Sequence, residues 1–538
     1  MKHLKKFMSI LLTAIMVLAM CVPVMAATVT IDGTSEGGVL QNHTFAAYQI
    51  FSGDQSTENN KVVLSNIVWG SGIDGDKFLN ELKGDTTYGS KFTNASMADS
   101  LAKVLGANVN DSAFAKFVAK TAYKNKKGDG TSIAAGSVNN LSAGYYLIVD
   151  TTTLSDGQAA NSALLQVVGD VHIQVKTDVP KVEKKVLENT KYAKDDGYGS
   201  GYNDVADYNI GDMVSFHLIG TVPDMSAYET YYYQFKDTLG TQFDMPDTNN
   251  IKIYLSKDKK VDTDTTDADV DTDVTDKFEI TVDSSKHIFY VTAKNEDIKT
   301  WADRSYIIVE YSAKLNANAA IGQPGQENKV DLTYTNNPDT NGHGKTKEDK
   351  VIVFTYELDT KKIGDGDANK TLAGAEFKLK NADGKWVKVD NNSKVKEWVD
   401  HEVDGSTLTS ASDGIFKIIG LDSGNYTLKE TKAPSGYNLP SSPANEFAVE
   451  LTATTANGQN WSEVAAEAYT NLSVKLNNQP GTVDSSKGTA TVTVSNEKGS
   501  TLPETGGIGT TIFYVVGVVL MLGAGVLLIT KRRMSAKH

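Results

Sequence analysis

Alternating apolar and polar positions run through most of this chain and predict β-strands. Residues 306–311 and 351–356 are typical, because β-branched and aromatic side chains there lie between turn-rich segments. Glycine is plentiful between such runs, as expected for the turns that connect short strands. The pattern therefore predicts an all-β fold made of sandwich domains.

One region has helical spacing instead. Within residues 74–124, apolar side chains recur three or four positions apart, first over residues 97–105 and again over residues 114–118. Asn110 and Asp111 precede the second group and are placed to cap a helix. We therefore expect helices inserted into the sheets of the first domain.

Long apolar runs lie at both ends of the chain. Residues 7–22 follow the basic stretch 2–6 and precede small residues, which is the pattern of a secretion signal cleaved after Ala26. Residues 508–529 are about long enough to cross a bilayer. The basic cluster 531–533 behind them favours the cytoplasmic side. We expect a secreted chain that halts in the membrane with its bulk outside.

Composition narrows the possible functions. The formal net charge of -14 leaves no basic surface for a nucleic-acid partner. The single cysteine, Cys21, lies in the predicted signal, so the mature chain has no disulfide. The sequence shows no catalytic triad, metal-ligand cluster or phosphate-binding loop. We therefore expect no metal, no cofactor and no enzymatic activity toward other molecules.

Domain boundaries follow from turn-rich segments. Pro180 ends the pairing that a strand at 171–176 begins, because proline has no backbone donor. A second change follows the loop 336–342, and we place that boundary near Lys350. The expected divisions are a signal at 1–26, three domains at 27–176, 177–349 and 350–500, and a C-terminal segment at 501–538.

A short motif precedes the C-terminal apolar run. Leu502, Pro503, Glu504, Thr505 and Gly506 resemble the L-P-x-T-G substrate of sortases, transpeptidases that cleave between threonine and glycine and pass the threonyl group to an amine. The alternative is an ordinary membrane anchor, which would need no such motif. The resemblance implies that sortase is a partner and that the membrane holds the chain only until sorting.

Two further segments resemble a known family. Residues 372–377 and 426–437 look like parts of the Cna-B type domain of Gram-positive surface proteins, the second being its E-box. Residues 180–186 and 328–336 resemble the ends of the middle domain of sortase-assembled backbone pilins. Residues 141–150 weakly repeat 421–430, sharing leucine, glycine, tyrosine and a closing carboxylate. The whole mature chain is thus similar to a backbone pilin, which implies an elongated rod of immunoglobulin-like domains.

The resemblance also implies chemistry inside the domains. Pilins of this kind form a Lys-Asn isopeptide bond beside an acid without help from an enzyme, and each bond should tie the first strand of its domain to the last. Burial lowers the pKa of an amine and raises that of a carboxylic acid. The neutral acid can then polarise the amide and carry a proton to the leaving ammonia, while the fold supplies proximity.

The family pattern places one bond in the third domain, between Lys362 and Asn496 with Glu430 as the acid. Period-two alternation puts all three on apolar faces; Lys362, for example, shares its face with Tyr356 and Leu358. The alternative is that each of these polar residues lies in solvent at a strand end.

A second bond is implied in the middle domain, between Lys184 and Asn328 with Asp237 as the acid. Lys184 falls on the inward face of its strand, and Lys185 on the outward face. For Asp237 the alternative is an ordinary turn aspartate. In the first domain Asp150 occupies the place of the acid, but the last strand lacks an asparagine, so we predict no bond there.

A backbone pilin also needs a lysine that receives the next subunit. The usual Tyr-Pro-Lys triplet is absent, and Lys176 holds the equivalent position, with Lys181 as the alternative. The resemblance implies identical subunits, accessory pilins and peptidoglycan as partners and a cell-surface pilus (fimbria) as the location. The alternative function is a singly wall-anchored adhesin or an accessory pilin.

Overall fold

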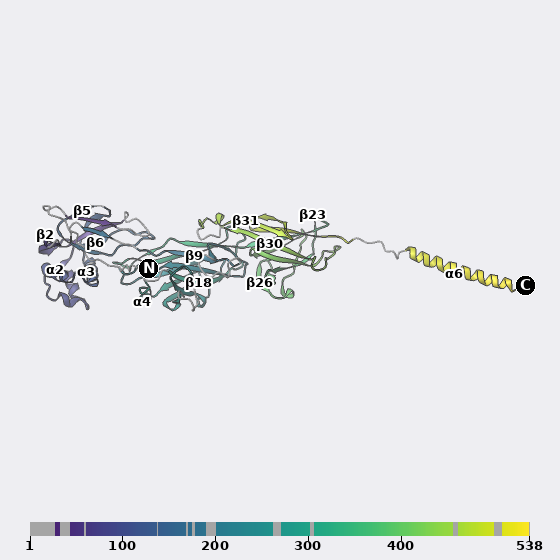
Figure 1. The fold of residues 1–538 in the computed structure, drawn as a ribbon, viewed down its shortest axis with the longest axis horizontal. Coiled ribbons are helices and arrows are strands. Elements are labelled where there is room, and N and C mark those ends of the chain that lie inside the picture. Colours follow the sequence, from purple (N-terminus) through teal and green to yellow (C-terminus); the bar gives the residue numbers. More distant parts are fainter. Residues whose placement is uncertain are drawn as a thin grey trace, which may run out of the picture.

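In a computed structural model, the chain folds into an elongated series of units (Figure 1). Three β-rich units follow one another along the long axis, and one long helix lies beyond them (Figure 1). The predicted all-β fold of tandem sandwich domains is confirmed. The structure describes residues 27–32, 43–58, 61–136, 138–167, 171–174, 178–189, 201–261, 271–301, 306–455, 461–499 and 508–536.

The first unit contains two small sheets. One has the order β5-β1-β8, and the other has the order β3-β2-β6-β7 with β4 beside β2. The long strand β2 pairs with β3, β4 and β6 and so forms the centre of the unit. The strands are β1 (Ala27–Asp32), β2 (Thr44–Glu58), β3 (Lys61–Trp69), β4 (Thr131–Ala134), β5 (Val138–Leu141), β6 (Gly144–Asp150), β7 (Leu164–Val167) and β8 (Val171–Gln174).

Helices inserted between β3 and β4 confirm the predicted helical region. They are α1 (Gly75–Gly84), η2 (Gly89–Phe92), α2 (Ala98–Ala107) and α3 (Ser112–Lys124). Asp111 caps α3 by accepting a hydrogen bond from the Phe114 backbone nitrogen at 2.9 Å, as its position predicted. Met97 was wrongly placed on the apolar face: it precedes α2 as the N-cap residue, and its side chain is exposed.

The middle unit is a sandwich of two larger sheets. Their orders are β10-β9-β12-β18-β14-β15 and β11-β21-β19-β13-β17-β16, with β20 beside β19. The strands are β9 (Val182–Leu187), β10 (Tyr202–Asn203), β11 (Val205–Asp207), β12 (Met213–Thr221), β13 (Tyr233–Leu239), β14 (Lys252–Ser256), β15 (Thr272–Asp273), β16 (Phe278–Asp283), β17 (Ile288–Ala293), β18 (Tyr306–Lys314), β19 (Gln326–Asn337), β20 (Gly342–Lys345) and β21 (Asp349–Phe354). Short helices are η3 (Thr248–Asn250), η4 (Thr275–Lys277) and α4 (Asn295–Ile298).

The third unit is also a two-sheet sandwich. One sheet has the order β23-β22-β34-β33 with β28 beside β22, and the other runs β26-β25-β24-β29-β30-β31-β32 with β27 beside β24. The strands are β22 (Tyr356–Gly364), β23 (Asp367–Thr371), β24 (Glu376–Asn381), β25 (Trp386–Val389), β26 (Val395–Val399), β27 (Leu408–Thr409), β28 (Ile415–Leu421), β29 (Gly424–Lys432), β30 (Glu446–Thr455), β31 (Tyr469–Leu476), β32 (Gln479–Pro480), β33 (Thr482–Asp484) and β34 (Thr489–Asn496). Short helices are η5 (Glu402–Asp404) and α5 (Ala465–Ala468).

The second domain boundary lies later than the sequence suggested. A boundary near Lys350 would place all of residues 350–362 in the third domain, but this segment divides at Thr355. Strand β21 pairs with β19 and β11 of the middle unit, whereas β22 pairs with β28 and β34 of the third. The boundary near Lys350 is therefore corrected to Thr355, because alternation within one strand does not reveal which sheet the strand joins.

The middle and third units share one apolar core, which also takes in Ala159 of the first unit, whereas the rest of the first unit has cores of its own. At the shared joint, the rings of Phe354 and Tyr356 lie 5.3 and 5.7 Å from the ring of Tyr469. The first unit instead meets the middle one through polar contacts: the Ala160 backbone nitrogen, for example, donates to the Asn336 carbonyl at 2.7 Å. The second joint is therefore mainly apolar, whereas the first is largely polar.

The C-terminal helix α6 (Ile508–Ser535) stands apart from the sandwiches (Figure 1). Residues 509–535 are long and apolar enough to cross a membrane, and none of the most apolar stretch is buried against the protein. This agrees with the predicted membrane-spanning run. The predicted signal at 1–26 and the motif at 502–506 lie outside the described residues.

Candidate functional site

Two buried polar groups lie inside the molecule, one in the middle sandwich and one in the third. Each contains a lysine, a carboxyl group and an asparagine, all 0–2 % exposed. The inward orientation predicted from alternation is confirmed for every member. These residues are Lys184 on β9, Asp237 on β13, Asn328 on β19, Lys362 on β22, Glu430 on β29 and Asn496 on β34.

In the third unit, the group spans both sheets. Strands β22 and β34 are parallel neighbours that bring Lys362 and Asn496 to the same end of one sheet. Glu430 projects from the facing sheet, and its Oε1 lies 3.2 Å from Lys362 Nζ. The Asn496 amide nitrogen donates to the Asn438 carbonyl at 2.8 Å. Amine, amide and acid are thus buried together between the two sheets.

Burial biases both ionisable groups of this site toward their neutral forms. Burial raises the pKa of Glu430 above its usual value, and it lowers the pKa of Lys362; the attraction between the two charges opposes both shifts without cancelling them. A neutral amine is a nucleophile, and a neutral carboxyl group can donate a hydrogen bond. Both shifts therefore favour the neutral amine and the neutral acid that amide exchange would use.

The middle site places its lysine opposite the asparagine across the sandwich. Lys184 extends from β9 in one sheet and forms an ion pair with Asp237 from β13 in the other. Asn328 lies on β19, which pairs with β13 so that Asn328 is opposite Leu239. Burial raises the pKa of Asp237 and lowers that of Lys184, again against their mutual attraction. The chemistry available is the same as in the third unit.

A tyrosine that sequence reasoning missed completes the middle site. The Tyr311 hydroxyl accepts hydrogen bonds from Lys184 Nζ at 3.1 Å and from the Asn328 amide nitrogen at 2.8 Å, and it donates to Asp237 Oδ2 at 3.0 Å. Tyr311 lies in a run that was identified as a strand. No sequence signal pairs its hydroxyl with residues far away in the chain.

The two sites tie different strands. In the third unit, Lys362 and Asn496 lie on the first and last strands, as expected. In the middle unit, Asn328 lies on β19, and β20 and β21 follow it. The expectation that each pair joins first to last strand is therefore wrong for the middle unit. The reason is the assignment of β21, which extends that unit past the strand bearing the asparagine.

Lys185 is on the outward face of β9, as predicted, but it is not in solvent. Its side chain is buried because Asp204 covers it, with Nζ 2.5 Å from Oδ1. The Trp461 backbone nitrogen of the third unit donates to the other Asp204 oxygen at 2.8 Å. This charge pair is therefore part of the joint between the middle and third units.

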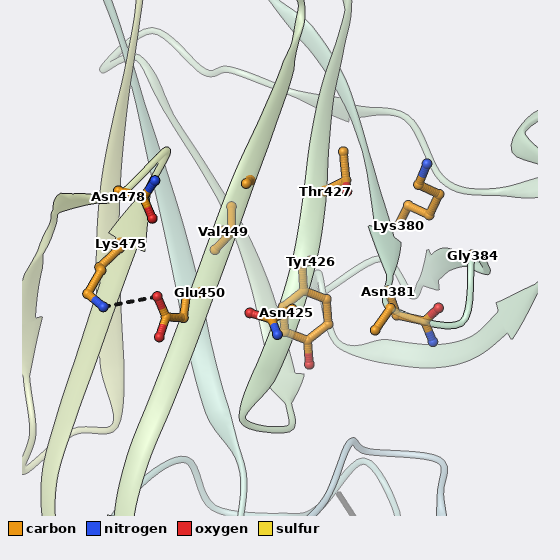
Figure 2. A pocket seen from close by; sticks show the side chains of 12 residues that line it. Lys380, Asn381, Gly384, Asn425, Tyr426, Thr427, Val449, Glu450, Lys475 and Asn478 are labelled. Atoms are coloured by element: carbon orange, nitrogen blue, oxygen red, sulfur yellow. Dashed lines mark hydrogen bonds and ion pairs between the residues drawn. The ribbon is translucent and has the colours of Figure 1, made fainter. Parts of the chain in front are cut away.

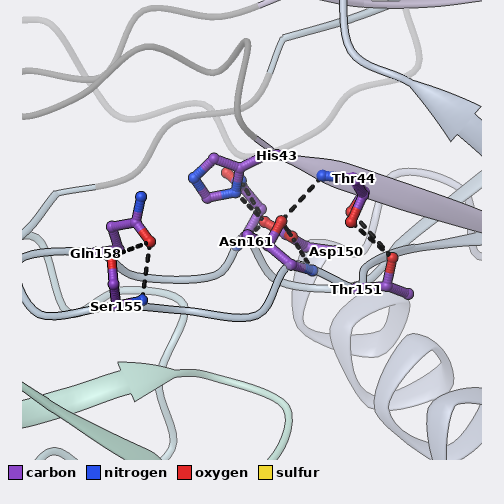
Figure 3. Close-up of polar contacts among 8 residues, drawn as sticks. His43, Thr44, Asp150, Thr151, Ser155, Gln158 and Asn161 are labelled. Carbon is purple, nitrogen blue, oxygen red and sulfur yellow. Dashed lines mark hydrogen bonds and ion pairs between the residues drawn. The ribbon is translucent and has the colours of Figure 1, made fainter.

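In the first unit, Asp150 lies in a different environment (Figure 3). His43 Nδ1 is 2.8 Å from Asp150 Oδ2, and both nitrogens of Asn161 donate to the same oxygen at 3.0 Å. Burial alone would raise the Asp150 pKa, but these bonds and those from Thr152 outweigh it and lower the pKa to about 2. A carboxylate held charged cannot act as the neutral acid, which supports our prediction of no bond there.

The repeat between the first and third domains has a structural counterpart. The Tyr146 hydroxyl donates to the Ser142 carbonyl at 3.0 Å, and the Tyr426 hydroxyl donates to the Asp422 carbonyl at 2.8 Å. In both segments, the hydroxyl of a strand tyrosine donates a hydrogen bond to the backbone carbonyl four residues earlier. The two segments therefore form the same local turn, although their closing carboxylates differ in environment.

A surface hollow of about 500 Å³ lies on the third unit, away from the buried site (Figure 2). Asn425 and Thr427 line it from the outward face of β29, whereas Glu430 lies on the inward face of the same strand. Lys475 and Glu450 form an ion pair at its edge, with Nζ 3.0 Å from Oε2. The hollow contains none of the predicted site residues.

The structure describes only one of the two candidate acceptor lysines. Lys176 lies outside the described residues. Lys181 has an exposed side chain directly before β9, and its backbone nitrogen donates to Thr221 Oγ1 at 2.8 Å. Its amine is therefore accessible on a fixed backbone. The choice between the two lysines stays a prediction.

Two family models match the C-terminal half of the chain. Residues 357–461 match SpaA, a prealbumin-like fold domain, and residues 494–535 match the LPXTG cell wall anchor motif. The second match covers the expected sorting signal. The resemblance to wall-anchored pilins is therefore confirmed, and the chain carries the anchor of a cell-surface protein.

The chain is also similar to a bacterial surface protein and to two pilins of known structure. The chain is 26 % identical over 277 residues to the trypsin-resistant surface T6 protein of Streptococcus pyogenes serotype M6, covering 42 % of this chain and 48 % of that protein, about half its length. Among solved structures, the T6 backbone pilin of Streptococcus pyogenes is 15 % identical with a TM-score of 0.49, covering 89 % of this chain and 100 % of that one. The major pilin SpaD of Corynebacterium diphtheriae is 16 % identical with a TM-score of 0.48, covering 88 % and 98 %.

Proposed function

We propose that this chain is the structural backbone subunit of a covalently polymerised pilus anchored to the cell wall, which supports adhesion and colonisation. The observation that carries the proposal is the pair of buried Lys-acid-Asn groups, placed in successive sandwiches of a chain that ends in a wall anchor motif. Such groups could cross-link each sandwich covalently, which suits a rod that bears load. The chain would act as a structural element and not as an enzyme on other substrates.

Polymerisation would use the two ends of the rod. A sortase would cleave between Thr505 and Gly506, release the membrane helix, and transfer the threonyl group to a lysine of an identical subunit. Lys176 is our first choice for that lysine, and Lys181 the second. The same acyl transfer to accessory pilins or to peptidoglycan would complete and anchor the fibre, so that the membrane holds the chain only before sorting.

Internal isopeptide bonds would stiffen each rod. The lysine amine attacks the asparagine side-chain carbon, ammonia leaves, and the buried acid, Glu430 or Asp237, donates to the amide oxygen as charge develops there. In the third unit the bond would join neighbouring strands at which tension enters and leaves. A covalent link would then carry load that otherwise falls on hydrogen bonds worth about 0.5–1.5 kcal/mol each.

Immunoblots of wall extracts test the proposal. A backbone pilin gives a ladder of high-mass polymers, and Lys176→Arg should abolish the ladder while the monomer is still exported, because a guanidinium stays protonated and cannot attack the acyl-enzyme. Lys396→Arg, at an exposed position in the third unit, is the matched control. Loss of the ladder in Lys181→Arg alone would move the role to Lys181. A single band from the wild-type chain would instead indicate a singly anchored adhesin.

A further inference from the structure

The middle site contains a hydroxyl group that the third site lacks. The Tyr311 hydroxyl contacts Lys184 Nζ at 3.1 Å and the Asn328 amide nitrogen at 2.8 Å. The first nitrogen would attack in the proposed bond formation, and the second would leave. Among the residues that the structure describes, no other group is hydrogen-bonded to both nitrogens.

We propose that Tyr311 is a catalytic residue of the middle domain, which carries the proton from the attacking lysine nitrogen to the departing amide nitrogen. This inference rests on the proposed isopeptide function and names a participant in it. The tyrosine would act together with Asp237, whose side chain it also contacts.

The step balances without any other reactant. The Lys184 Nζ, as a neutral amine, forms a bond to the side-chain carbon of Asn328, and the bond from that carbon to Nδ2 breaks. Nζ must lose one proton, and Nδ2 must gain one to leave as ammonia. Once the carbon is tetrahedral, Nδ2 is a basic amine. The Tyr311 hydroxyl then turns its proton from Asp237 Oδ2 to Nδ2 and accepts a proton from Nζ. It therefore ends the reaction unchanged.

The packing around Tyr311 holds its hydroxyl in place for this exchange. The ring is stacked on Phe216 with centroids 5.2 Å apart and lies edge-on to Phe289 at 4.9 Å. The whole residue is 1 % exposed. Burial also raises the pKa of its hydroxyl well above the usual value, so the group stays protonated before reaction. A fixed, dry hydroxyl exchanges protons only with the partners that the fold provides.

The Tyr311 hydroxyl also fixes which oxygen of Asp237 can carry a proton. It donates to Asp237 Oδ2, while Asp237 Oδ1 and Asn328 Oδ1 have no hydrogen-bond partner among the described residues. A proton on Asp237 would therefore reside on Oδ1. Unsatisfied buried oxygens are costly, and a proton there would supply the donor that the amide oxygen lacks. The two residues thus have different roles: Asp237 polarises the carbonyl, and Tyr311 transfers the proton.

The third site provides an internal comparison. There the amide nitrogen of Asn496 donates to the Asn438 carbonyl, which can accept a hydrogen bond but cannot give a proton. Glu430 must then serve both functions. A change at Tyr311 should affect only the middle bond, so each molecule contains its own control.

The test is Tyr311→Phe in a soluble chain of residues 27–500, followed by intact mass and cross-linked peptides over time after synthesis. We expect the Lys362-Asn496 bond to form normally and the Lys184-Asn328 bond to form about 100-fold more slowly or not at all, as for loss of a general acid-base group. Tyr233→Phe is the matched control. It removes another buried hydroxyl of the same core, one that donates to the Thr221 carbonyl at 2.9 Å.

Several outcomes decide the question. A Tyr311→Phe chain that loses both ammonias at the wild-type rate overturns the role of Tyr311 and leaves the isopeptide function intact. A wild-type chain without the middle bond overturns the isopeptide proposal itself. If the phenylalanine variant fails to fold, 3-fluorotyrosine at position 311 keeps shape and hydroxyl but makes the hydroxyl more acidic. Its rate should differ from wild type with a shifted pH profile, and an unchanged profile rejects proton transfer.

Discussion

Replacing Glu430 by glutamine should leave the third domain without its covalent bond. Glu430→Gln keeps the size of the neutral acid but cannot take up or release the proton that bond formation requires. Burial already biases Glu430 toward the neutral form, so the substitution changes little else at the site. The variant should therefore fold, with Lys362 and Asn496 present but unlinked.

The stability that the variant loses depends on the length of the loop that the bond closes. Lys362 and Asn496 enclose a loop of about 135 residues, and a cross-link of that span lowers the entropy of the unfolded chain by an amount worth about 5 kcal/mol. Leaving buried polar groups unlinked adds about 1–3 kcal/mol. For a unit of this size, the cross-link alone, about 5 kcal/mol, corresponds to a melting temperature lower by about 10–20 °C.

Intact mass and thermal unfolding of the soluble chain 27–500 check this prediction together. Wild type should weigh two ammonias less than its sequence, and Glu430→Gln only one less. Glu450→Gln is the matched control, since that carboxylate lies on the next strand, half exposed, in a surface pair with Lys475. A Glu430→Gln chain with the full wild-type mass loss would refute the role of the acid. An unlinked chain with an unchanged melting temperature would refute the entropy argument.

Three other predictions concern force and pH. Under tension, the linked third domain should barely extend. The middle domain should release at most about 90 Å of chain, because residues 329–354 lie beyond Asn328 and outside its bond. Single-molecule pulling measures both extensions, and equal extension of the two domains would contradict this prediction. Asp150 has a pKa of about 2 in the folded chain against an ordinary 3.8. The free energy of unfolding of the first unit should therefore decrease by about 2 kcal/mol as the pH falls from 4 through 2. Asp150→Asn should remove that pH dependence in acid unfolding. Asp339 accepts from the Ala163 backbone nitrogen across the first joint, and burial raises its pKa to about 6. The docked state therefore binds the proton more tightly, so docking should strengthen as the pH falls below 6; small-angle scattering of wild type and Asp339→Asn should show this difference, and identical profiles would exclude it.

Much of the candidate site could be predicted from the sequence because the pleat of a strand is local. Alternation alone identified Lys362 rather than Lys361, and Lys184 rather than Lys185, as the inward lysines. The helical spacing and the cap at Asp111 are equally local signals. The anchor motif needs no fold at all, since an enzyme recognises it as a linear peptide.

Other features depended on which strands pair across the chain. Alternation could not show that β21 belongs to the middle sheet, that Asp204 covers Lys185, or that Asp150 faces His43 instead of a lysine. Lys184 and Tyr311 are 127 positions apart in the chain, and they meet only because the fold brings β9 and β18 into the same sheet. In the strands that carry the candidate sites, sequence alone thus determined which side chains face inward, because that depends on adjacent residues. Only the tertiary structure decided which of them meet, because those contacts depend on strand order and on the packing of two sheets.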